Sequence, residues 1–293
     1  MARYGKNQEP ESTRLARDAQ QNGTIQSYGT QNAYESALRG FVEHAREIAG
    51  YEGSLKQVPD SLVQEYLGMR SETVGQKTLD QDRQAISAIT GQTYERVKAD
   101  YQTTDRATEP RAYTDDQVAV IREALSEKHD IATQVAHEAG LRAHELHTLR
   151  PAEERAATAN RPWSNDRFAG RENQVKYTVQ GKGGLVREVS LSRETAQRLE
   201  NYRREASQRV TDRKIEYRSY YAIGGGNAWT QAISRASNRM LGWSHGAHGL
   251  RHAYAQDRVK ELKNAGHFRD DALRIVSQEL GHFRPDITEV YLR

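Results

Sequence analysis

The sequence predicts a mainly α-helical protein that carries one small β-hairpin or sheet and is divided into two domains. Two domains are favoured because the chain has 293 residues, whereas single hydrophobic cores rarely exceed roughly 250 to 300 residues. Apolar side chains recur at helical spacing through most of the chain, and strand-like alternation is confined to residues 174–191. With 36% hydrophobic and 28% charged residues, the composition fits a soluble globular protein with a packed core.

The amino-terminal part is expected to be a helical domain between two polar segments. Residues 1–24 are rich in Gln, Asn, Arg and Glu and show no apolar period, which predicts a mobile arm. Apolar side chains recur from Thr30 to Ile48, which predicts an amphipathic helix. Shorter helical patterns cover residues 59–68, 79–89 and 94–101. We therefore expect a helical domain over residues 25–103 and a polar linker over residues 104–112.

Residues 113–293 are expected to form the second domain. Thr114 and Gln117 have the spacing of a capping box at a helix start. Gly140 can end a helix in a left-handed C-cap, so that Arg142 begins the next one. The alternating residues 174–191 predict a hairpin with GKGG, including Lys182, at its turn. Helical patterns then cover residues 192–210, 228–241 and 249–265, with a glycine loop at 224–226.

Composition excludes several classes of protein. The chain has no cysteine, which rules out disulfides and thiolate metal sites. It lacks an apolar run of the roughly 20 residues that cross a bilayer and the apolar stretch of a secretory signal. We therefore expect a cytoplasmic protein without a membrane partner. The net charge of +3 does not by itself predict nucleic-acid binding.

Four blocks in the second half of the chain carry residues suited to phosphoryl transfer. They are GLRAHEL with Arg142 and Glu145, GKGG with Lys182, HGLRH with His248 and Arg251, and LGHFRPDITEVYLR with His282 and Tyr291. Taken singly, each block has an ordinary explanation, such as a surface ion pair, a hairpin turn or a packed tyrosine. The occurrence of all of them in one order, each in the local structure that its role requires, favours one functional site.

The chemistry of a phosphodiester assigns each residue a role. Two guanidiniums, Arg142 and Arg251, neutralise the charge that grows on the non-bridging oxygens. Because His248 precedes Arg251 by three residues, both side chains can face one anion from one helix, and His282 adds a further donor. Tyr291 attacks phosphorus to give a phosphotyrosine, and Lys182 protonates the leaving 5′-oxygen. Glu145 orients a neighbouring cation. No metal or nucleotide cofactor is required.

On these blocks, above all HGLRHAYA and LGHFRPDITEVY, the second domain resembles the tyrosine recombinases, the phage-integrase-like site-specific recombinases. The resemblance implies a mixed α/β catalytic domain whose site comprises Arg142, Lys182, His248, Arg251, His282 and Tyr291, with Glu145 in support. It implies that residues 25–103 are a helical core-binding domain that closes a C-shaped clamp on DNA. It also implies double-stranded DNA with a specific recombination site as partner, a homotetramer on paired sites, and a monomer or weak dimer without DNA.

The sequence departs from this family in two places. Residues 151–173 are longer and more polar than the usual connection between the first arginine and the hairpin, and we interpret them as an extra loop. Family members usually continue past the tyrosine into a helix that docks on a neighbouring protomer, whereas Leu292 and Arg293 end this sequence. The expectation is therefore either a truncated chain or protomers that couple through another surface.

Other residues were weighed for metal and DNA binding. His245, His248, His252 and His267 suggest a metal site, but HExxH and cysteine are absent, and we expect no metal. The basic stretch 198–218 is explained equally by a solvated helix and by phosphate contacts. Asn227, Arg235 and Arg239 flank the glycine loop and are candidate DNA contacts, with surface placement as the equal alternative.

The predicted function is site-specific DNA recombination through a 3′-phosphotyrosine intermediate, which integrates, excises or rearranges a mobile element. Such an enzyme is expected in the cytoplasm of its own or a host cell, associated with the nucleoid when it binds DNA. The alternatives are a non-catalytic DNA-binding regulator on the same scaffold and a relaxing enzyme of the type IB topoisomerase kind. The DNA sequence recognised depends on base contacts and DNA shape that one chain does not reveal.

Overall fold

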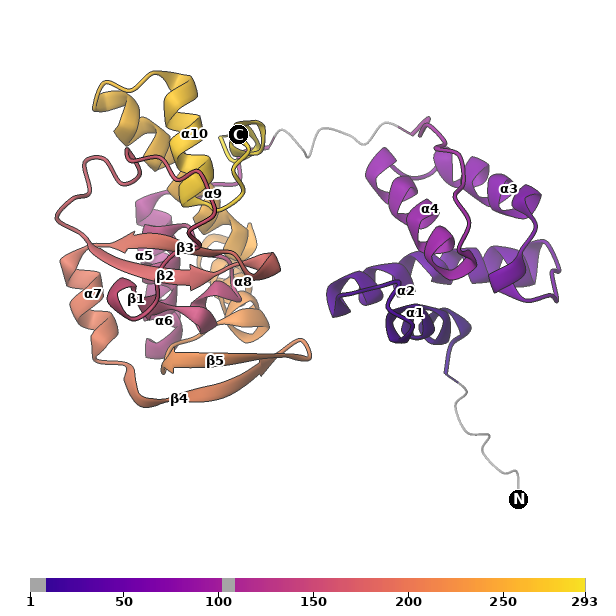
Figure 1. Ribbon diagram of the computed structural model, residues 1–293, viewed down its shortest axis with the longest axis horizontal. Coiled ribbons are helices and arrows are strands. Elements are labelled where there is room, and N and C mark those ends of the chain that lie inside the picture. The colour runs from indigo at the N-terminus through magenta and orange to yellow at the C-terminus, as the bar shows by residue number, and fades with distance from the viewer. Residues whose placement is uncertain (1–8, 102–108, 293) are drawn as a thin grey trace. The chain divides into compact units, whose positions relative to one another are not determined.

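A computed structural model describes residues 9–101 and 109–292. The chain divides into two compact units, Met1–Ala107 and Thr108–Arg293, which Figure 1 draws in indigo to purple and in magenta to yellow. Residues 1–8 of the expected arm and residues 104–108 of the expected linker lie outside the described residues. Each unit is described below by itself.

The amino-terminal unit is helical, as the sequence predicts. Its core joins residues of every helix in the unit, including Leu38, Phe41, Val63 and Ile86, all of which are almost fully buried. The α-helices of its described residues are α1 (Glu11–Gln21), α2 (Tyr28–Glu43), α3 (Asp60–Ser71) and α4 (Gln76–Thr90), with a π-helical turn η1 (His44–Ile48) and a 3-10 turn η2 (Leu55–Gln57).

Two expectations for this unit are wrong. Residues 11–21 are not a mobile arm: they form α1, whose Leu15, Ala16 and Ala19 are buried in the core of the unit. The spacing of these small apolar residues along one helical face outweighs the polar composition of the segment. Residues 94–101 are not helical and have no regular secondary structure: Tyr94 is buried in the core, and the backbone N–H groups of Asp100 and Tyr101 bond to the Ser71 carbonyl.

The carboxyl-terminal unit combines helices with two small antiparallel sheets (Figure 1). The predicted capping box of Thr114 and Gln117 opens α5, and Gly140 caps α6 with a φ of 61°. Its helices in the described residues are α5 (Asp115–Glu123), α6 (Glu127–Ala139), α7 (Arg193–Glu200), α8 (Gly226–Leu241), α9 (Gly246–Asn264), α10 (Arg269–Glu279) and α11 (Pro285–Val290), with 3-10 turns η3 (Glu145–Thr148), η4 (Ala152–Glu154) and η5 (Lys182–Gly184).

The first sheet contains the predicted hairpin. Its strands are β1 (Arg150–Pro151), β2 (Val175–Gln180) and β3 (Val186–Leu191), in the order β1-β2-β3. Tyr177 pairs with Val189 and Val179 with Arg187, so alternate side chains face the core. The turn of this hairpin, η5, holds Lys182 as expected.

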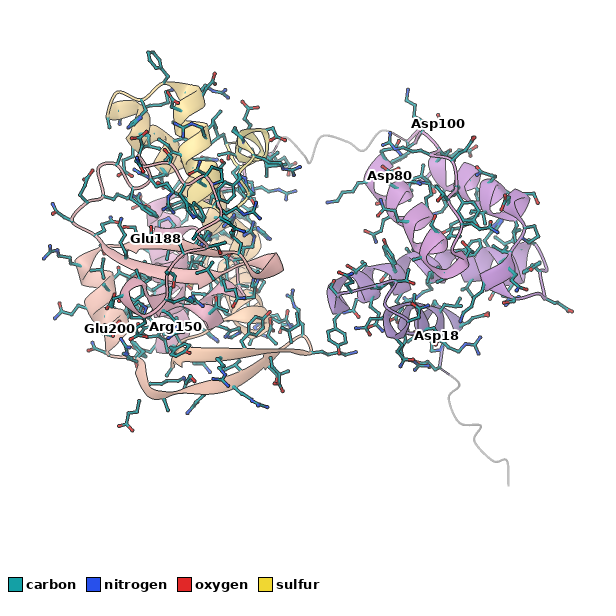
Figure 2. The ribbon with its side chains drawn as sticks, viewed as in Figure 1. Asp18, Asp80, Asp100, Arg150, Glu188 and Glu200 are labelled. Atoms are coloured by element: carbon teal, nitrogen blue, oxygen red, sulfur yellow. The ribbon has the colours of Figure 1, made fainter. Side chains whose placement is uncertain are left out.

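The second sheet corrects the prediction for residues 192–210. The helix there ends at Glu200, and the chain continues as a ribbon of β4 (Arg203–Asp212) and β5 (Ile215–Tyr221). The basic stretch is therefore largely strand, because Arg213 and Lys214 adopt positive φ angles and close the tight turn that pairs the two strands. Glu200, labelled in Figure 2, accepts hydrogen bonds from Tyr177 and Tyr221, each at 2.8 Å, and so links the two sheets.

Two clusters in this unit build the frame for the site. One packs α5, α6 and α8 against the first sheet through residues such as Ile131, Val135 and Trp229, and the other packs α9 against α10. The predicted fold class, mainly helical with small antiparallel sheets, is confirmed. No helix among residues 9–101 and 109–292 has the length and apolar character needed to span a membrane.

Candidate active site

The site is built around Glu145, whose side chain is fully buried. Gly140 ends α6 in a left-handed conformation, and a Cβ there would lie 2.6 Å from Tyr254, so only glycine fits. The chain then turns at Arg142. The prediction that Arg142 begins an α-helix is wrong, because Arg142 lies before the 3-10 turn η3. The Arg142 backbone N–H and its Nη1 donate to the two Glu145 oxygens at 2.7 and 3.0 Å.

A further arginine on β3, Arg187, completes the other side of Glu145. Its side chain is 1% exposed, and its Nη2 donates to Glu145 Oε2 at 2.8 Å. Its Nε and Nη1 have no hydrogen-bond partner among the described residues. Arg187 lies outside the four sequence blocks, although an arginine at an inward-facing position of a strand is a signal that the alternation of the strand contains.

Three guanidiniums keep Glu145 ionised. Burial opposes the charge on this carboxyl, but the neighbouring charges of Arg187, Arg251 and Arg142 overcome it and lower its pKa to about 2. One buried carboxylate therefore faces several arginines, so the centre keeps an excess of positive charge. Such a centre is suited to binding an anion.

Arg251 lies on α9 and is 1% exposed. Its Nη2 donates to the Leu280 carbonyl at 2.7 Å, and its Nη1 donates to the Gly140 carbonyl. Its remaining nitrogen, Nε, lies 3.4 Å from the Tyr291 hydroxyl oxygen. Burial and the charge of Arg142 lower the pKa of Arg251 to about 10, so it stays protonated at neutral pH.

Tyr291 follows α11, and its ring packs between two imidazoles. The ring centroid lies 4.8 Å from that of His252 and 6.1 Å from that of His282, the latter pair being stacked. Gln256 Nε2 donates to the Tyr291 carbonyl at 3.1 Å. His252 therefore supports the tyrosine and is not part of a histidine metal cluster in the described contacts.

Asp286 and Glu289 have the spacing of a capping pair, but they do not cap the short helix before Tyr291. α11 begins after Arg284 with Pro285 in its first turn, and no side chain of the described residues caps it. Glu289 instead pairs with Arg269 at 2.8 Å. The proline sets the start of this helix.

Two histidines of the set are held neutral. Burial and the charges of Arg251 and Arg142 lower the pKa of His282 to about 4, and the same causes lower the pKa of His248. Both ring nitrogens of His282 are buried without a hydrogen-bond partner among the described residues. His282 therefore has free hydrogen-bonding capacity beside the tyrosine.

Lys182 is placed by its backbone. It follows Gly181, where a Cβ would lie 3.2 Å from Glu145 Oε1, so the hairpin turn is adjacent to the centre. Contacts within the described residues thus bring together Arg142, Glu145, Arg251, His282 and Tyr291, with His248 close enough to interact electrostatically with both arginines.

Two of the three candidate DNA contacts, Asn227 and Arg239, make other interactions within the unit. Asn227 Oδ1 accepts from Arg213 at 3.0 Å, and its N–H donates to Asp212, which ties the β4–β5 turn to α8. Arg239 donates to the Ala124 carbonyl at 2.7 Å, and Arg235 is exposed. None of these contacts reaches the arginine centre.

One group of side chains in the described part of the chain has the spacing of metal ligands. Its members, Asp115, His137 and Asp257, have ligand atoms within 4.8 Å of one another. The group includes none of His245, His248, His252 and His267 and shares no residue with the arginine centre.

The arrangement can perform one kind of chemistry well. An anion bound by Arg142 and Arg251 would lie beside the Tyr291 hydroxyl, because Arg251 contacts that hydroxyl directly. The tyrosine oxygen is a nucleophile, and the surrounding arginines stabilise negative charge on the group it attacks. A phosphodiester meets both requirements.

Comparison with solved structures identifies the fold. The chain resembles XerH site-specific recombinase bound to difH substrate, with a TM-score of 0.57 and 18% identity over 98% of this chain and 82% of that one. It resembles the Tn1549 transposon integrase in complex with circular intermediate DNA, with a TM-score of 0.54 and 16% identity over 96% and 94%. It also resembles a lambda integrase dimer bound to a COC′ core site, with a TM-score of 0.59 and 13% identity over 95% and 76%.

No family model matches the sequence, and no curated protein matches it. The likeness to the three recombinases therefore rests on structure, and it confirms at the level of the fold the resemblance drawn from the sequence blocks.

Proposed function

We propose that this protein is a site-specific DNA recombinase that cleaves and rejoins DNA through a 3′-phosphotyrosine intermediate. The observation that carries the proposal is the 3.4 Å contact between Arg251 Nε and the Tyr291 hydroxyl, at the edge of the Arg142–Glu145–Arg187 cluster. This contact joins a nucleophile to an anion-binding group. The shared fold with DNA-bound recombinases supports DNA as the anion.

Each residue has one task in the reaction. Arg142 and Arg251 bind the non-bridging oxygens of the scissile phosphate, assisted by His248 and His282. The Tyr291 hydroxyl loses its proton to water as its oxygen forms a bond to phosphorus. The bond from phosphorus to the 5′-oxygen breaks, and Lys182 gives that oxygen its proton. The 5′-hydroxyl of a partner duplex then attacks the phosphotyrosine and releases Tyr291. Each step breaks one phosphoester bond and forms another, so the reaction needs no energy-supplying cofactor.

The proposed partner is double-stranded DNA with a specific site, bound by both units as a clamp with residues 25–103 as the core-binding domain. Recombination of two duplexes requires four active subunits, and the solved lambda integrase is described both as a dimer on a core site and as a tetramer on a Holliday junction. We extend this to a homotetramer on paired sites and to a monomer or weak dimer without DNA. Asn227, Arg235 and Arg239 remain proposed DNA contacts. The proposed role is to integrate, excise or rearrange a mobile element.

A nicked suicide substrate tests the mechanism, because loss of the short strand beyond the nick traps the covalent intermediate. The natural site is read first, by footprinting the protein on DNA that flanks its own gene. The wild-type protein is expected to give a protein–DNA adduct, and Tyr291→Phe none. Tyr202→Phe is the matched control, since its hydroxyl pairs with Glu127 outside the site. Absence of an adduct in the wild type, or its persistence in Tyr291→Phe, contradicts the proposal.

The same substrate separates the alternative functions. A non-catalytic regulator binds DNA without an adduct. A relaxing enzyme of the topoisomerase IB kind forms the adduct and relaxes supercoils, yet joins no separate sites.

The role of Lys182 needs a second substrate. Lys182→Ala is expected to cleave ordinary DNA slowly but to spare a 5′-phosphorothiolate, because a thiolate leaves without a proton. Equal loss on both substrates rejects Lys182 as the general acid.

A further inference from the structure

The connection between β1 and β2, residues 152–174, crosses from the sheet to the end of α10. At the sheet, the Thr158 N–H donates to the Val186 carbonyl at 2.9 Å, and the Val186 N–H donates to Thr158 Oγ1 at 3.0 Å. At the helix, the Ser164 N–H donates to Gln278 Oε1 at 2.7 Å. The segment that we interpreted from the sequence as an extra loop is thus attached to β3 at Thr158 and to α10 at Ser164.

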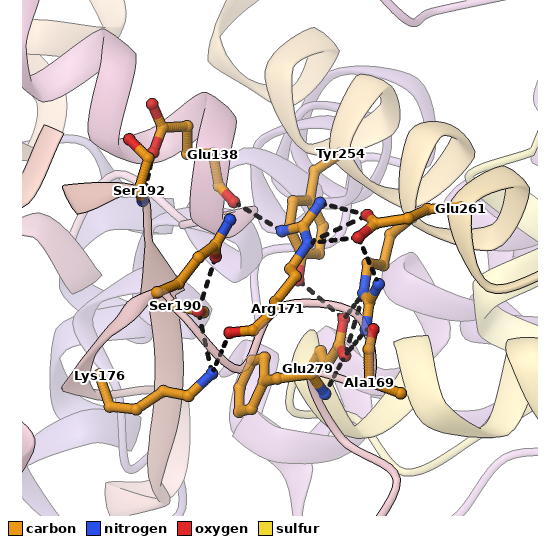
Figure 3. Close-up of polar contacts among 12 residues, drawn as sticks. Glu138, Ala169, Arg171, Lys176, Ser190, Ser192, Tyr254, Glu261 and Glu279 are labelled. Carbon is orange, nitrogen blue, oxygen red and sulfur yellow. Dashed lines mark hydrogen bonds and ion pairs between the residues drawn. The ribbon is translucent and has the colours of Figure 1, made fainter. Parts of the chain in front are cut away.

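Beyond Ser164 the connection is anchored by buried charge. The Phe168 N–H donates to Glu279 Oε1 at 3.0 Å, and Arg258 donates to the Ala169 carbonyl at 2.9 Å. Figure 3 shows Arg171 reaching Glu261 beside this anchor, with their closest contact at 2.7 Å. Residues 168–171 are therefore fixed to α9 and α10.

Between these attachments, Trp163 packs on Phe283. The ring centroids of Trp163 and Phe283 are 4.7 Å apart. The Arg167 guanidinium carbon lies over the indole, 4.3 Å from the Trp163 ring centroid. Arg161 lies 5.6 Å from the Phe283 ring centroid, and Trp163 Nε1 donates to the Thr158 carbonyl at 2.8 Å. The indole is thus held by its own segment and presented to Phe283.

Phe283 is one of the few non-glycine residues in the left-handed region, with a φ of 54°. It belongs to the turn after α10, in which the His282 and Phe283 N–H groups bond to the Ser277 carbonyl at 3.0 and 3.3 Å. For a side chain larger than Asn or Asp this conformation is strained and persists only where the surroundings hold it. The turn carries His282, and the Leu280 carbonyl just before it binds Arg251.

We infer that Trp163 is a positioning residue, which holds Phe283 in its left-handed conformation and thereby fixes His282 against Tyr291. This inference extends the proposed function, and its kinetic test rests on that function. The connection between β1 and β2 is thus a support for the turn beside the nucleophile. Neither Trp163 nor Phe283 contacts Tyr291 in the described interactions, so both act through His282.

Two substitutions of Phe283 distinguish two roles of its contact with Trp163: holding a strained turn in place, or simply burying an aromatic ring. Phe283→Ala removes the ring and keeps the strain, whereas Phe283→Gly removes both, because glycine adopts this φ freely. We expect adduct formation at saturating DNA to be about tenfold slower in Phe283→Ala and clearly faster in Phe283→Gly than in Phe283→Ala. A Phe283→Gly variant as slow as Phe283→Ala, or slower, overturns the inference.

Trp163 is tested in the same assay. Trp163→Ala is expected to slow adduct formation at unchanged DNA affinity, and Trp163→Phe to restore most of the rate. In the Phe283→Gly background Trp163→Ala should have little further effect, because no strained residue remains to be held. Additive losses in the double variant overturn the inference. Asn165→Ala, exposed in the same segment, is the matched control.

A readout without DNA keeps this inference distinguishable from the proposed function. The His282 imidazole signal in NMR spectra, assigned by its loss in His282→Gln, reports its environment directly. Trp163→Ala is expected to raise the pKa of His282 from about 4 toward the ordinary 6.5, while the buried His44 signal stays unchanged. An unchanged His282 titration in folded Trp163→Ala contradicts the inference even if the adduct assay fails for every variant.

Discussion

The arginine centre and the tyrosine-bearing tail differ in how firmly the fold holds them. Glu145, Arg187 and Arg251 are almost completely buried, and they come from η3, β3 and α9. By contrast, α11 has six residues, of which only Thr288 is buried, and Val290 is 44% exposed. The fold therefore fixes the anion-binding charges in advance, while the nucleophile depends on a few ring contacts and hydrogen bonds. Changes in the centre should affect stability, and changes in the tail should affect rate.

The largest expected effect comes from removing the buried carboxylate. Glu145→Ala leaves Arg142, Arg187 and Arg251 without their shared counter-charge, which typically costs about 3 to 5 kcal/mol for a buried pair. The free energy of unfolding of the carboxyl-terminal unit, measured by urea denaturation, should fall by this amount. Glu205→Ala, exposed on β4, is the control and should change it by less than about 0.5 kcal/mol. A loss below about 1 kcal/mol in Glu145→Ala would contradict the view of a fixed ionic centre.

The same carboxylate predicts a defined acid sensitivity. Its pKa is lowered in the folded protein from 4.5 to about 2, so ionised Glu145 stabilises the fold fully above pH 4.5, and this contribution is lost as the pH falls toward 2. The shift corresponds to roughly 3 kcal/mol. The difference in unfolding free energy between the wild type and Glu145→Gln should therefore shrink across this window. A difference that stays constant from neutral pH to about pH 2.5 would show that the charge of Glu145 is not what stabilises the centre.

The sequence predicts the centre better than its supports. Gly140, the hairpin turn and the His248–Arg251 spacing are local patterns, and local hydrogen bonding is sufficient to produce them. Arg187 was missed because a charged residue on a strand is usually exposed, and only the pairing of β3 with β2 turns it toward Glu145. Its burial follows from a partner 42 positions away, which no local pattern contains.

The errors in secondary structure have the same origin. α1 was read as an arm because its charged residues outnumber the three small apolar ones that reach the core of the unit. Most of β4 was predicted to be helical because its arginines and glutamates have no clear alternation, and the structure of the β4–β5 ribbon depends on the turn at Arg213 and Lys214. In both cases tertiary packing decides between two conformations that the sequence leaves close in energy.

The tail should loosen in mild acid. Burial, to which the Tyr291 ring contributes, is the main cause that lowers the pKa of His252 from 6.5 to about 4, whereas the hydrogen bond to the Tyr291 carbonyl raises it. Docking of Tyr291 disfavours the protonated ring to the extent that this burial outweighs the hydrogen bond. This stabilisation of the docked tail is complete above pH 6.5 and is lost as the pH falls through 4. Near pH 5.5 the docking equilibrium should be less favourable than at neutral pH, by at most about tenfold.

Tyr291 ring signals in NMR spectra measure this equilibrium, since the two neighbouring imidazole rings, His282 stacked and His252 tilted, shift them. His252→Asn removes one titrating group and should make the pH dependence shallower, leaving the part due to His282. An unchanged pH dependence in His252→Asn would assign the effect to His282 alone.

The smallest expected effect concerns the ion pair at the surface of the tail. Arg269 and Glu289 lie 2.8 Å apart, but their side chains are 55% and 49% exposed, so water and salt screen their attraction. Exposed pairs of this kind contribute about 0.2 to 1 kcal/mol, so Arg269→Ala should slow adduct formation by no more than about fivefold, with no loss at high salt. Arg274→Ala is the matched control, because its ion pair with Asp271 stays within α10 and does not reach α11. If Arg269→Ala instead slowed the reaction more than about tenfold, charge at the surface would hold α11, and the ring contacts of Tyr291 with His252 and His282 would be secondary.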